Sequence, residues 1–181
     1  NLVDVMMMKQ LKSLLLLPAI LLLIWLGLKW YRIPGAKVGA QAYDFVGYLP
    51  NGDSLALKDF KGKMVLLEFW GSWCGPCRVA NKELVPLYHE YKDARFKKES
   101  SFEIISVGIE TNKDRWLAAI KKDGLEWPHH VSDIKRLNDH VALLYGIKEI
   151  PNTFLIDGTG KVIGVNLSYK KVGEILARRQ E

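Results

Sequence analysis

Apolar runs and helical periodicities alternate along residues 41–181, and this order predicts an α/β fold. The two longest runs, Met64–Trp70 and Phe102–Ile109, are almost continuously apolar, as is typical of parallel strands buried on both faces of a sheet. A long helix is expected from Cys74 to Phe96, with a kink at Pro86 because proline removes one backbone hydrogen bond. The other expected elements are two hairpins, Tyr43–Leu49 with Ser54–Leu57 and Thr153–Ile156 with Val162–Asn166, a short strand at Trp127–Ser132, and helices at Lys113–Lys122, Leu137–Tyr145 and Lys170–Arg179.

The N-terminal part of the chain is strongly apolar, and Ser13–Leu28 holds no charged residue. With its flanks, residues 11–31, it would span about 31 Å as a helix, enough for a bilayer core of about 30 Å. We expect a tail at 1–10, an uncleaved transmembrane signal anchor at 11–31, a linker at 32–40 and a folded domain at 41–181. A cleaved signal peptide is the alternative, with Val38–Ala40 as a small-residue site. Met8 is typical of the start of such a segment.

The charge is concentrated near the N-terminus. The chain has 26 Lys and Arg and 20 Asp and Glu, a formal net charge of +6. Residues 1–40 carry five of the basic residues and one acid, so 26 − 5 = 21 basic and 20 − 1 = 19 acidic residues remain beyond them. This nearly balanced domain has neither a basic stripe with interleaved aromatic residues nor a nucleic-acid motif, so we expect no nucleic-acid binding.

Both cysteines lie in the motif Trp73-Cys74-Gly75-Pro76-Cys77, directly after the first long strand. This spacing places both sulfur atoms at the start of the following helix, where unpaired N–H groups and the helix dipole favour a thiolate and where a proline fits the first turn. Thiol–disulfide exchange needs such a pair, because one thiolate attacks and a second thiol resolves the mixed disulfide. We therefore expect Cys74 to be the nucleophile and Cys77 the more buried resolving thiol.

Glu68 interrupts the apolar strand that leads into the motif. An isolated acid there is expected to be desolvated, with a raised pKa suited to accepting the Cys77 proton. The alternative is a glutamate on an edge strand that faces water. Of the two neighbouring tryptophans, we expect Trp73 to be exposed and Trp70 to be buried.

The cysteines have two other interpretations. A permanent disulfide would close a very short loop and contribute little stability, because disulfide stabilisation grows with loop length. A metal site could recruit His129, His130 or His140, but these histidines lack ligand-spaced partners, and a structural zinc site needs four ligands. We therefore expect no metal ligands in this chain.

The segment Phe69–Cys77, which ends in the cysteine motif and follows the acid Glu68 in an apolar strand, resembles thioredoxin. Ile150-Pro151 resembles that family's cis-proline loop, which pairs with substrate. From about Ala40 to Arg179 the chain is similar to the TlpA/ResA group of the thioredoxin superfamily, relatives of the AhpC/TSA proteins, and residues 110–128 look like its central insertion. The resemblance implies a thioredoxin-like three-layer α/β/α sandwich with an N-terminal β-hairpin, preceded by one transmembrane helix. It also implies substrate binding by Trp73, Gly75, Pro76, Ile150 and Pro151.

The same resemblance implies a function and a location. We expect a membrane-anchored thiol:disulfide oxidoreductase that reduces protein disulfides, with its domain on the extracytoplasmic (periplasmic) side of a bacterial inner membrane. Its redox group would be the Cys74–Cys77 disulfide, with no other cofactor. The group's usual electron donor is a membrane protein of the thiol–disulfide relay, and apocytochrome c is one frequent substrate. The alternatives are a disulfide oxidase or isomerase on the same fold and a non-catalytic copper-binding module.

Overall fold

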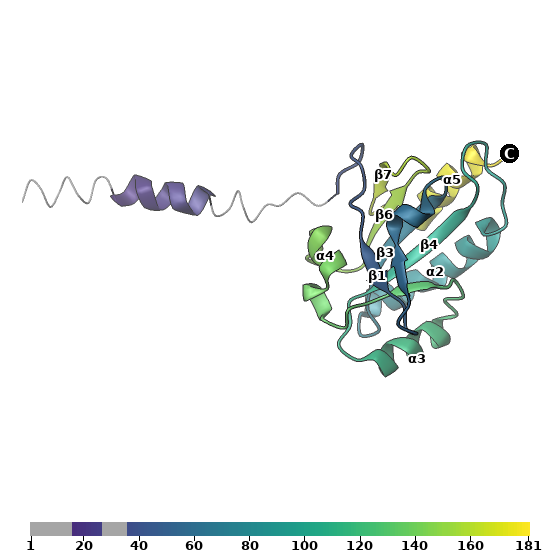
Figure 1. The fold of residues 1–181 in the computed structure, drawn as a ribbon, viewed down its shortest axis with the longest axis horizontal. Coiled ribbons are helices and arrows are strands. Elements are labelled where there is room, and N and C mark those ends of the chain that lie inside the picture. The colour runs from purple at the N-terminus through teal and green to yellow at the C-terminus, as the bar shows by residue number, and fades with distance from the viewer. Residues whose placement is uncertain (1–15, 27–35) are drawn as a thin grey trace, which may run out of the picture. The chain divides into compact units, whose positions relative to one another are not determined.

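The computed structural model describes residues 16–26 and 36–181 (Figure 1). The chain divides into two units, Asn1–Pro34 and Gly35–Glu181. Residues 16–26 of the first unit are helical, and their side chains are exposed. Within the described ranges, no helix has both the length and the apolar character needed to cross a bilayer. The expected tail at 1–10, both ends of the expected anchor at 11–31 and residues 32–35 of the expected linker lie outside the described residues.

The second unit is built on a five-stranded sheet in the order β5-β4-β3-β6-β7. The central strand β3 pairs in parallel with β4 and antiparallel with β6. A separate antiparallel hairpin, β1 with β2, precedes the sheet in the chain and confirms the expected N-terminal hairpin. The strands are β1 Val46–Tyr48, β2 Ser54–Ala56, β3 Met64–Trp70, β4 Phe102–Gly108, β5 His129–Val131, β6 Asn152–Ile156 and β7 Val162–Val165.

Helices cover the sheet in layers, as Figure 1 shows for α2, α3 and α5. These three helices, Gly75–Tyr91, Lys113–Asp123 and Tyr169–Arg179, share one apolar core with one face of β3. The hairpin, the 3₁₀ helix η1 (Leu57–Phe60) and α4 (His140–Leu144) pack on the other face. All residues of β3 are buried, because successive side chains enter opposite cores. The thioredoxin-like α/β fold is therefore confirmed.

The helix that follows the cysteines is shorter than expected. It ends at Tyr91 instead of Phe96, although Pro86 lies inside it as expected. Phe96 is buried and forms a β-bridge with Gln180, at the far end of α5. The apolar periodicity up to Tyr91 is that of the helix, whereas Phe96 is buried through a β-bridge after the helix has ended.

The expected helix Leu137–Tyr145 is two short helices. A 3₁₀ helix, η2 (Arg136–Asn138), precedes α4, and the backbone of Asp139 between them is extended, with φ −55° and ψ 132°. The Asp139 side chain caps α4 by accepting hydrogen bonds from the N–H groups of Val141 and Ala142. Capping of this kind is the usual role of aspartate at a helix start.

The folded unit begins earlier than residue 41. The Gly39 N–H donates to the Val162 carbonyl at 2.8 Å, and the Val162 N–H donates to the Ala40 carbonyl at 2.9 Å. Ala36 is buried in the core that the hairpin, η1 and α4 also share. Residues 36–40, which the sequence placed in the linker, are therefore part of the domain.

Candidate active site

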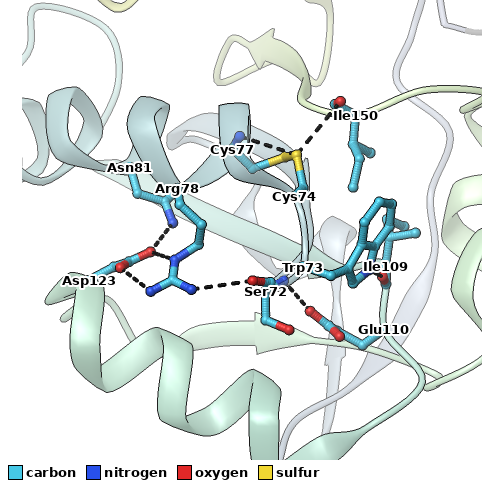
Figure 2. The surroundings of a disulfide bond; sticks show 10 residues. All are labelled: Ser72, Trp73, Cys74, Cys77, Arg78, Asn81, Ile109, Glu110, Asp123 and Ile150. Atoms are coloured by element: carbon cyan, nitrogen blue, oxygen red, sulfur yellow. Dashed lines mark hydrogen bonds and ion pairs between the residues drawn. A yellow bond between two sulfur atoms is a disulfide. The ribbon is translucent and has the colours of Figure 1, made fainter.

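The two cysteines lie where β3 ends and α2 begins. Cys74 is the N-cap residue of α2, and its sulfur accepts a hydrogen bond from the Cys77 N–H at 3.2 Å (Figure 2). Pro76 occupies the first turn, where its missing N–H leaves no helical hydrogen bond unmade. Cys74 and Cys77 form a disulfide. The expected placement of both sulfur atoms at a helix start is confirmed.

The two sulfur-bearing residues differ in access to solvent. Cys74 is 5% exposed and Cys77 is fully buried. The Cys74 sulfur lies 3.8 Å from the carbonyl oxygen of Ile150, and the Ile150–Pro151 peptide bond is cis. The structure therefore brings the proline loop against the outer cysteine, and it confirms the cis bond that the resemblance implied.

The loop before Cys74 is held by groups that the sequence did not single out. The Ser72 N–H donates to the fully buried carboxylate of Glu110, and the Trp73 indole N–H donates to the Ile109 carbonyl at 2.7 Å (Figure 2). Arg136 stacks on the Trp73 ring at 4.7 Å from its centroid. Glu110 directly follows the predicted buried strand Phe102–Ile109. This position was the only feature of the sequence that could have indicated a role for Glu110.

A second group fixes the first turn of α2 from the side of α3. The Arg78 guanidinium forms an ion pair with Asp123 at the end of α3 and donates to the Ser72 carbonyl at 3.3 Å. Asn81 also donates to Asp123, at 2.8 Å. Because these bonds join the loop, α2 and α3, they position the first turn of α2, which carries the dithiol. None of the three residues was predicted.

Glu68 projects from the middle of β3 toward the core that α2 and α5 cover, and it is fully buried. Burial is the main cause that raises its pKa from 4.5 to about 7, against the opposing effect of hydrogen bonding. The Ser106 hydroxyl donates to Glu68 Oε2 at 2.8 Å and accepts from the Trp127 indole N–H at 2.9 Å. The raised pKa is confirmed, and a water-facing edge position is excluded because β3 is the central strand.

The surface around the cysteines presents most of the residues expected to meet a substrate. Trp73 is 41% exposed whereas Trp70 is fully buried, as predicted. Gly75, Pro76 and Pro151 are exposed, and Ile150 is partly buried. A pocket of about 300 Å³ beside them is lined by Pro76, Val79, Ala80, Glu83, Pro151, Asn152, Thr153, Asn166, Leu167, Ser168 and Tyr169. The geometry thus offers an apolar rim and a groove next to the outer sulfur.

The histidines considered as metal ligands bind protein groups. His129 pairs with Glu103 at 3.3 Å, and His130 is buried with its Nε2 at 3.2 Å from the Leu125 carbonyl oxygen. Burial lowers the pKa of His130 to about 4. His140 contacts Asp133 through Nδ1 at 2.6 Å.

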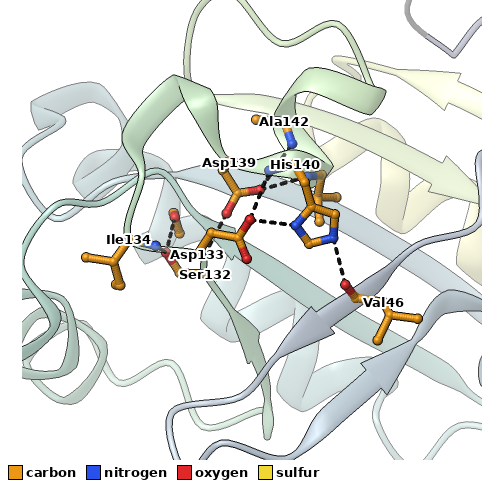
Figure 3. Close-up of polar contacts among 9 residues, drawn as sticks. Val46, Ser132, Asp133, Ile134, Asp139, His140 and Ala142 are labelled. Atoms are coloured by element: carbon orange, nitrogen blue, oxygen red, sulfur yellow. Dashed lines mark hydrogen bonds and ion pairs between the residues drawn. The ribbon is translucent and has the colours of Figure 1, made fainter.

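Asp133, Asp139 and His140 offer ligand atoms within 4.8 Å of one another. Their contacts are already made within the protein, as Figure 3 shows. His140 Nε2 lies 2.7 Å from the Val46 carbonyl oxygen, and Asp139 accepts from the Asp133 N–H at 2.8 Å. The cluster therefore ties α4 and the hairpin together.

Replacing Asp139 tests this structural role. We expect Asp139→Ala to lower the free energy of unfolding by about 2 kcal/mol, because it removes a helix cap and leaves buried N–H groups without acceptors. Chemical denaturation measures the change. The exposed Asp114, at the start of α3, is the control, and Asp114→Ala should stay within about 0.5 kcal/mol of the parent. Equal effects of the two substitutions would contradict the role.

Comparisons with known proteins agree with this geometry. The chain matches a family described as thioredoxin-like over residues 62–162. It is 34% identical over 127 residues to the thiol-disulfide oxidoreductase ResA of Bacillus thuringiensis subsp. konkukian, covering 70% of this chain and 68% of that protein. A solved thiol-disulfide oxidoreductase from Bacteroides fragilis is 31% identical with a TM-score of 0.65, covering 75% of this chain and 99% of that one. The thioredoxin domain of a Bacteroides vulgatus thiol-disulfide oxidoreductase is 30% identical with a TM-score of 0.67, covering 77% and 98%.

Proposed function

This chain belongs to the thioredoxin-like family and is a thiol–disulfide oxidoreductase, and we propose that it reduces protein disulfides with the Cys74–Cys77 pair. The observation that supports the proposal is the different placement of the two cysteines. Cys74 lies at the start of α2 beside the cis-proline loop, whereas Cys77 is buried in the core that also receives Glu68. The Cys74 sulfur is therefore placed to attack a substrate disulfide, and the Cys77 sulfur is placed to resolve the mixed disulfide.

The first step uses Cys74. In the reduced protein its thiolate attacks one sulfur of the substrate disulfide, so a Cys74–substrate bond forms and the substrate's own sulfur–sulfur bond breaks. The released substrate thiolate takes a proton from water. The free N–H groups of the first turn of α2 and the helix dipole stabilise the attacking thiolate.

The second step uses Cys77 and Glu68. The Cys77 thiol gives its proton to the Glu68 carboxylate as its sulfur attacks Cys74, and the substrate's second sulfur leaves as a thiolate that water protonates. Two electrons have then passed from the dithiol to the substrate. A base whose pKa is about 7 suits this transfer at neutral pH, since about half of it is ionised before the step.

We propose that electrons flow from this protein to its substrate, and the reduction potential tests that direction. Gly75-Pro76 between the cysteines is similar to the dipeptide of reducing thioredoxins. Equilibration of the protein in thiol buffers, with free thiols counted, should give a potential near or below about −230 mV. A value near about −120 mV would mark an oxidant instead, as the oxidase alternative requires. If the Cys74–Cys77 disulfide were neither reduced nor re-formed in these buffers, both the reductase and the oxidase interpretation would be contradicted.

The location and partners of the protein are further proposals. The apolar segment at residues 11–31 supports a single-pass anchor in a bacterial inner membrane, with the domain on the periplasmic side. There a membrane protein of the thiol–disulfide relay would re-reduce the dithiol, and apocytochrome c would be one substrate. Protease treatment of spheroplasts tests the topology, because the domain should be digested without lysis. Protection of the domain would overturn this orientation.

A further inference from the structure

Arg136 and Trp73 form a stack directly beside the nucleophilic cysteine. The central carbon of the Arg136 guanidinium lies 4.7 Å from the centroid of the Trp73 ring. Trp73 is the residue before Cys74 and is 41% exposed, and Arg136 is exposed as well. Neither residue of the stack lines the groove of about 300 Å³ beside the cysteines. The Arg136–Trp73 stack therefore borders Cys74 outside that groove.

The two residues that follow β4 hold both members of the stack. The Ile109 carbonyl accepts the Trp73 indole N–H at 2.7 Å (Figure 2), and the Glu110 carbonyl accepts the Arg136 N–H at 2.8 Å. The ring also rests on Gly71, where an added Cβ would lie 2.8 Å from the indole nitrogen. Because two consecutive carbonyl groups fix the two residues, the stack is part of the fold and not a chance surface contact.

The loop that carries Arg136 has an unusual backbone. Arg136 has a φ of 56° and Ile134 a φ of 58°, in the left-handed region that bulky and β-branched residues rarely adopt. The Ile134 N–H donates to the Ser132 hydroxyl at 3.0 Å, and that hydroxyl donates to the Gly108 carbonyl at 2.6 Å. Strained positions persist where surrounding contacts hold them, and they cluster at functional sites. The strain thus points to a role for the side chain that the loop presents.

The charge of Arg136 is not neutralised by a carboxylate of the part of the chain that the structure describes, where it forms no ion pair. On its own loop, Asp133 pairs with His140, and Asp139 accepts N–H groups at the start of α4. The Glu110 carboxylate accepts an N–H of the loop between β3 and α2. Stacking on an indole leaves the N–H groups at the edge of a guanidinium free. They are therefore available to a carboxylate from outside the protein.

We propose that Arg136 selects substrate proteins that carry an aspartate or glutamate within a few residues of the disulfide cysteine. This inference rests on the proposed function and names the substrate class of the same dithiol. An extended substrate chain advances about 3.3–3.6 Å per residue, so a carboxylate a few positions from the cysteine that Cys74 attacks reaches the stack. There it accepts a pair of N–H bonds from the guanidinium, as is typical of carboxylate recognition by arginine.

The test compares substrates that differ only in charge. Short peptides with one cysteine flanked by glutamate, by glutamine or by lysine are each joined through a disulfide to an aromatic thiol that is coloured when released. The aromatic thiolate is the better leaving group, so Cys74 attacks the peptide sulfur and the colour reports the first step. The reduced full-length protein, kept soluble with mild detergent, is mixed with each peptide. Each rate is divided by the rate of a small thiol with the same peptide, which removes differences in intrinsic reactivity.

We expect the parent to react about fivefold faster with the glutamate peptide than with the glutamine peptide, as the strongest exposed ion pairs allow, and slowest with the lysine peptide. Arg136→Gln should bring the glutamate-to-glutamine ratio close to one and leave the rate with the glutamine peptide unchanged, because the Cys74 sulfur is untouched. The matched control is Arg95→Gln, which removes the same charge and should leave the ratio unchanged. Arg95 is exposed and lies beyond the other end of α2, a helix about 25 Å long at about 1.5 Å per residue.

A glutamate-to-glutamine ratio of one in the parent at low salt overturns the inference, and so does a ratio that Arg136→Gln leaves unchanged. If Arg136→Gln fails to fold, the salt dependence of the parent decides. The ratio should fall toward one between about 0.01 M and about 1 M salt, since the Debye length falls from about 30 Å to about 3 Å, and a ratio that salt does not change overturns the inference. If the parent releases no coloured thiol from any peptide, the proposed function fails, whereas equal release from all three contradicts only the selection by Arg136.

Discussion

Cys77→Ala should stop the reaction at a covalent intermediate between this protein and its substrate. Cys74 remains able to attack a disulfide, but no thiol is left within the protein to resolve the product. An oriented intramolecular thiol acts at an effective concentration of about 10⁵ M or more, so its loss should lower steady-state disulfide reduction by at least about a thousandfold. With an aromatic disulfide, the variant should release one equivalent of coloured thiolate where the parent releases two.

Cys74→Ala is the matched variant, because it leaves only the fully buried Cys77 sulfur. It should release almost no thiolate and form no stable adduct. Mass spectrometry of Cys77→Ala after exposure to a cell extract would then identify the trapped substrates through adducts that a reductant removes. If Cys77→Ala released two equivalents, or if Cys74→Ala formed the adduct, the assignment of nucleophile and resolving thiol would be wrong.

Glu68→Gln should make the protein more stable at neutral and alkaline pH while slowing its chemistry. The folded state holds the Glu68 proton up to a pKa of about 7, whereas the unfolded chain loses it near 4.5. Glu68 therefore lowers the stability of the parent as pH rises from about 4.5 to about 7, and the loss is complete above that range. The glutamine keeps the shape and carries no charge, so it should add about 3 kcal/mol at pH 8 and almost nothing at pH 4.5.

Urea denaturation of the oxidised parent and variant at both pH values measures this difference, since neither cysteine titrates in the disulfide. Other groups change stability over the same range, among them the buried His130, whose pKa is lowered to about 4. They are common to both proteins and cancel in the comparison. Glu126, whose side chain is 62% exposed, is the control, and Glu126→Gln should change stability by less than about 0.5 kcal/mol at either pH. An advantage of Glu68→Gln that does not grow with pH would show that Glu68 is not a buried, half-ionised acid.

Local signals predicted the elements that contain the chemistry. The strand Met64–Trp70 has the bounds expected from its apolar run, and the placement of Cys74 at a helix start followed from the motif that the run enters. Glu68 was recognisable because one acid in an otherwise apolar central strand has no route to water. These inferences succeeded because each depends on residues close together in the chain.

The errors arose where distant residues decide the structure. The helix ends at Tyr91 because Phe96 pairs with Gln180, which no periodicity near Phe96 reveals. Glu110 and Ser72 lie 38 positions apart, and Arg78 and Asp123 lie 45 apart, so their bonds depend on how β4 and α3 are placed beside α2. The hydrogen bonds that hold the loop before Cys74 could therefore not be predicted from one sequence. The reactive groups, Cys74, Cys77 and Glu68, could be predicted.

The chain joins the domain at the end of the sheet remote from the cysteines. Gly39 and Ala40 bond to Val162, which pairs with Ile156, and Ile156 in turn pairs with Val65 at the start of β3. The dithiol follows the other end of that strand, about 17 Å away at about 3.3 Å per residue. If the domain is immobilised on a bead or a sensor surface through its N-terminal side, the attachment point therefore lies at the end of the sheet opposite the dithiol. The Cys74 sulfur would remain accessible to a partner in solution.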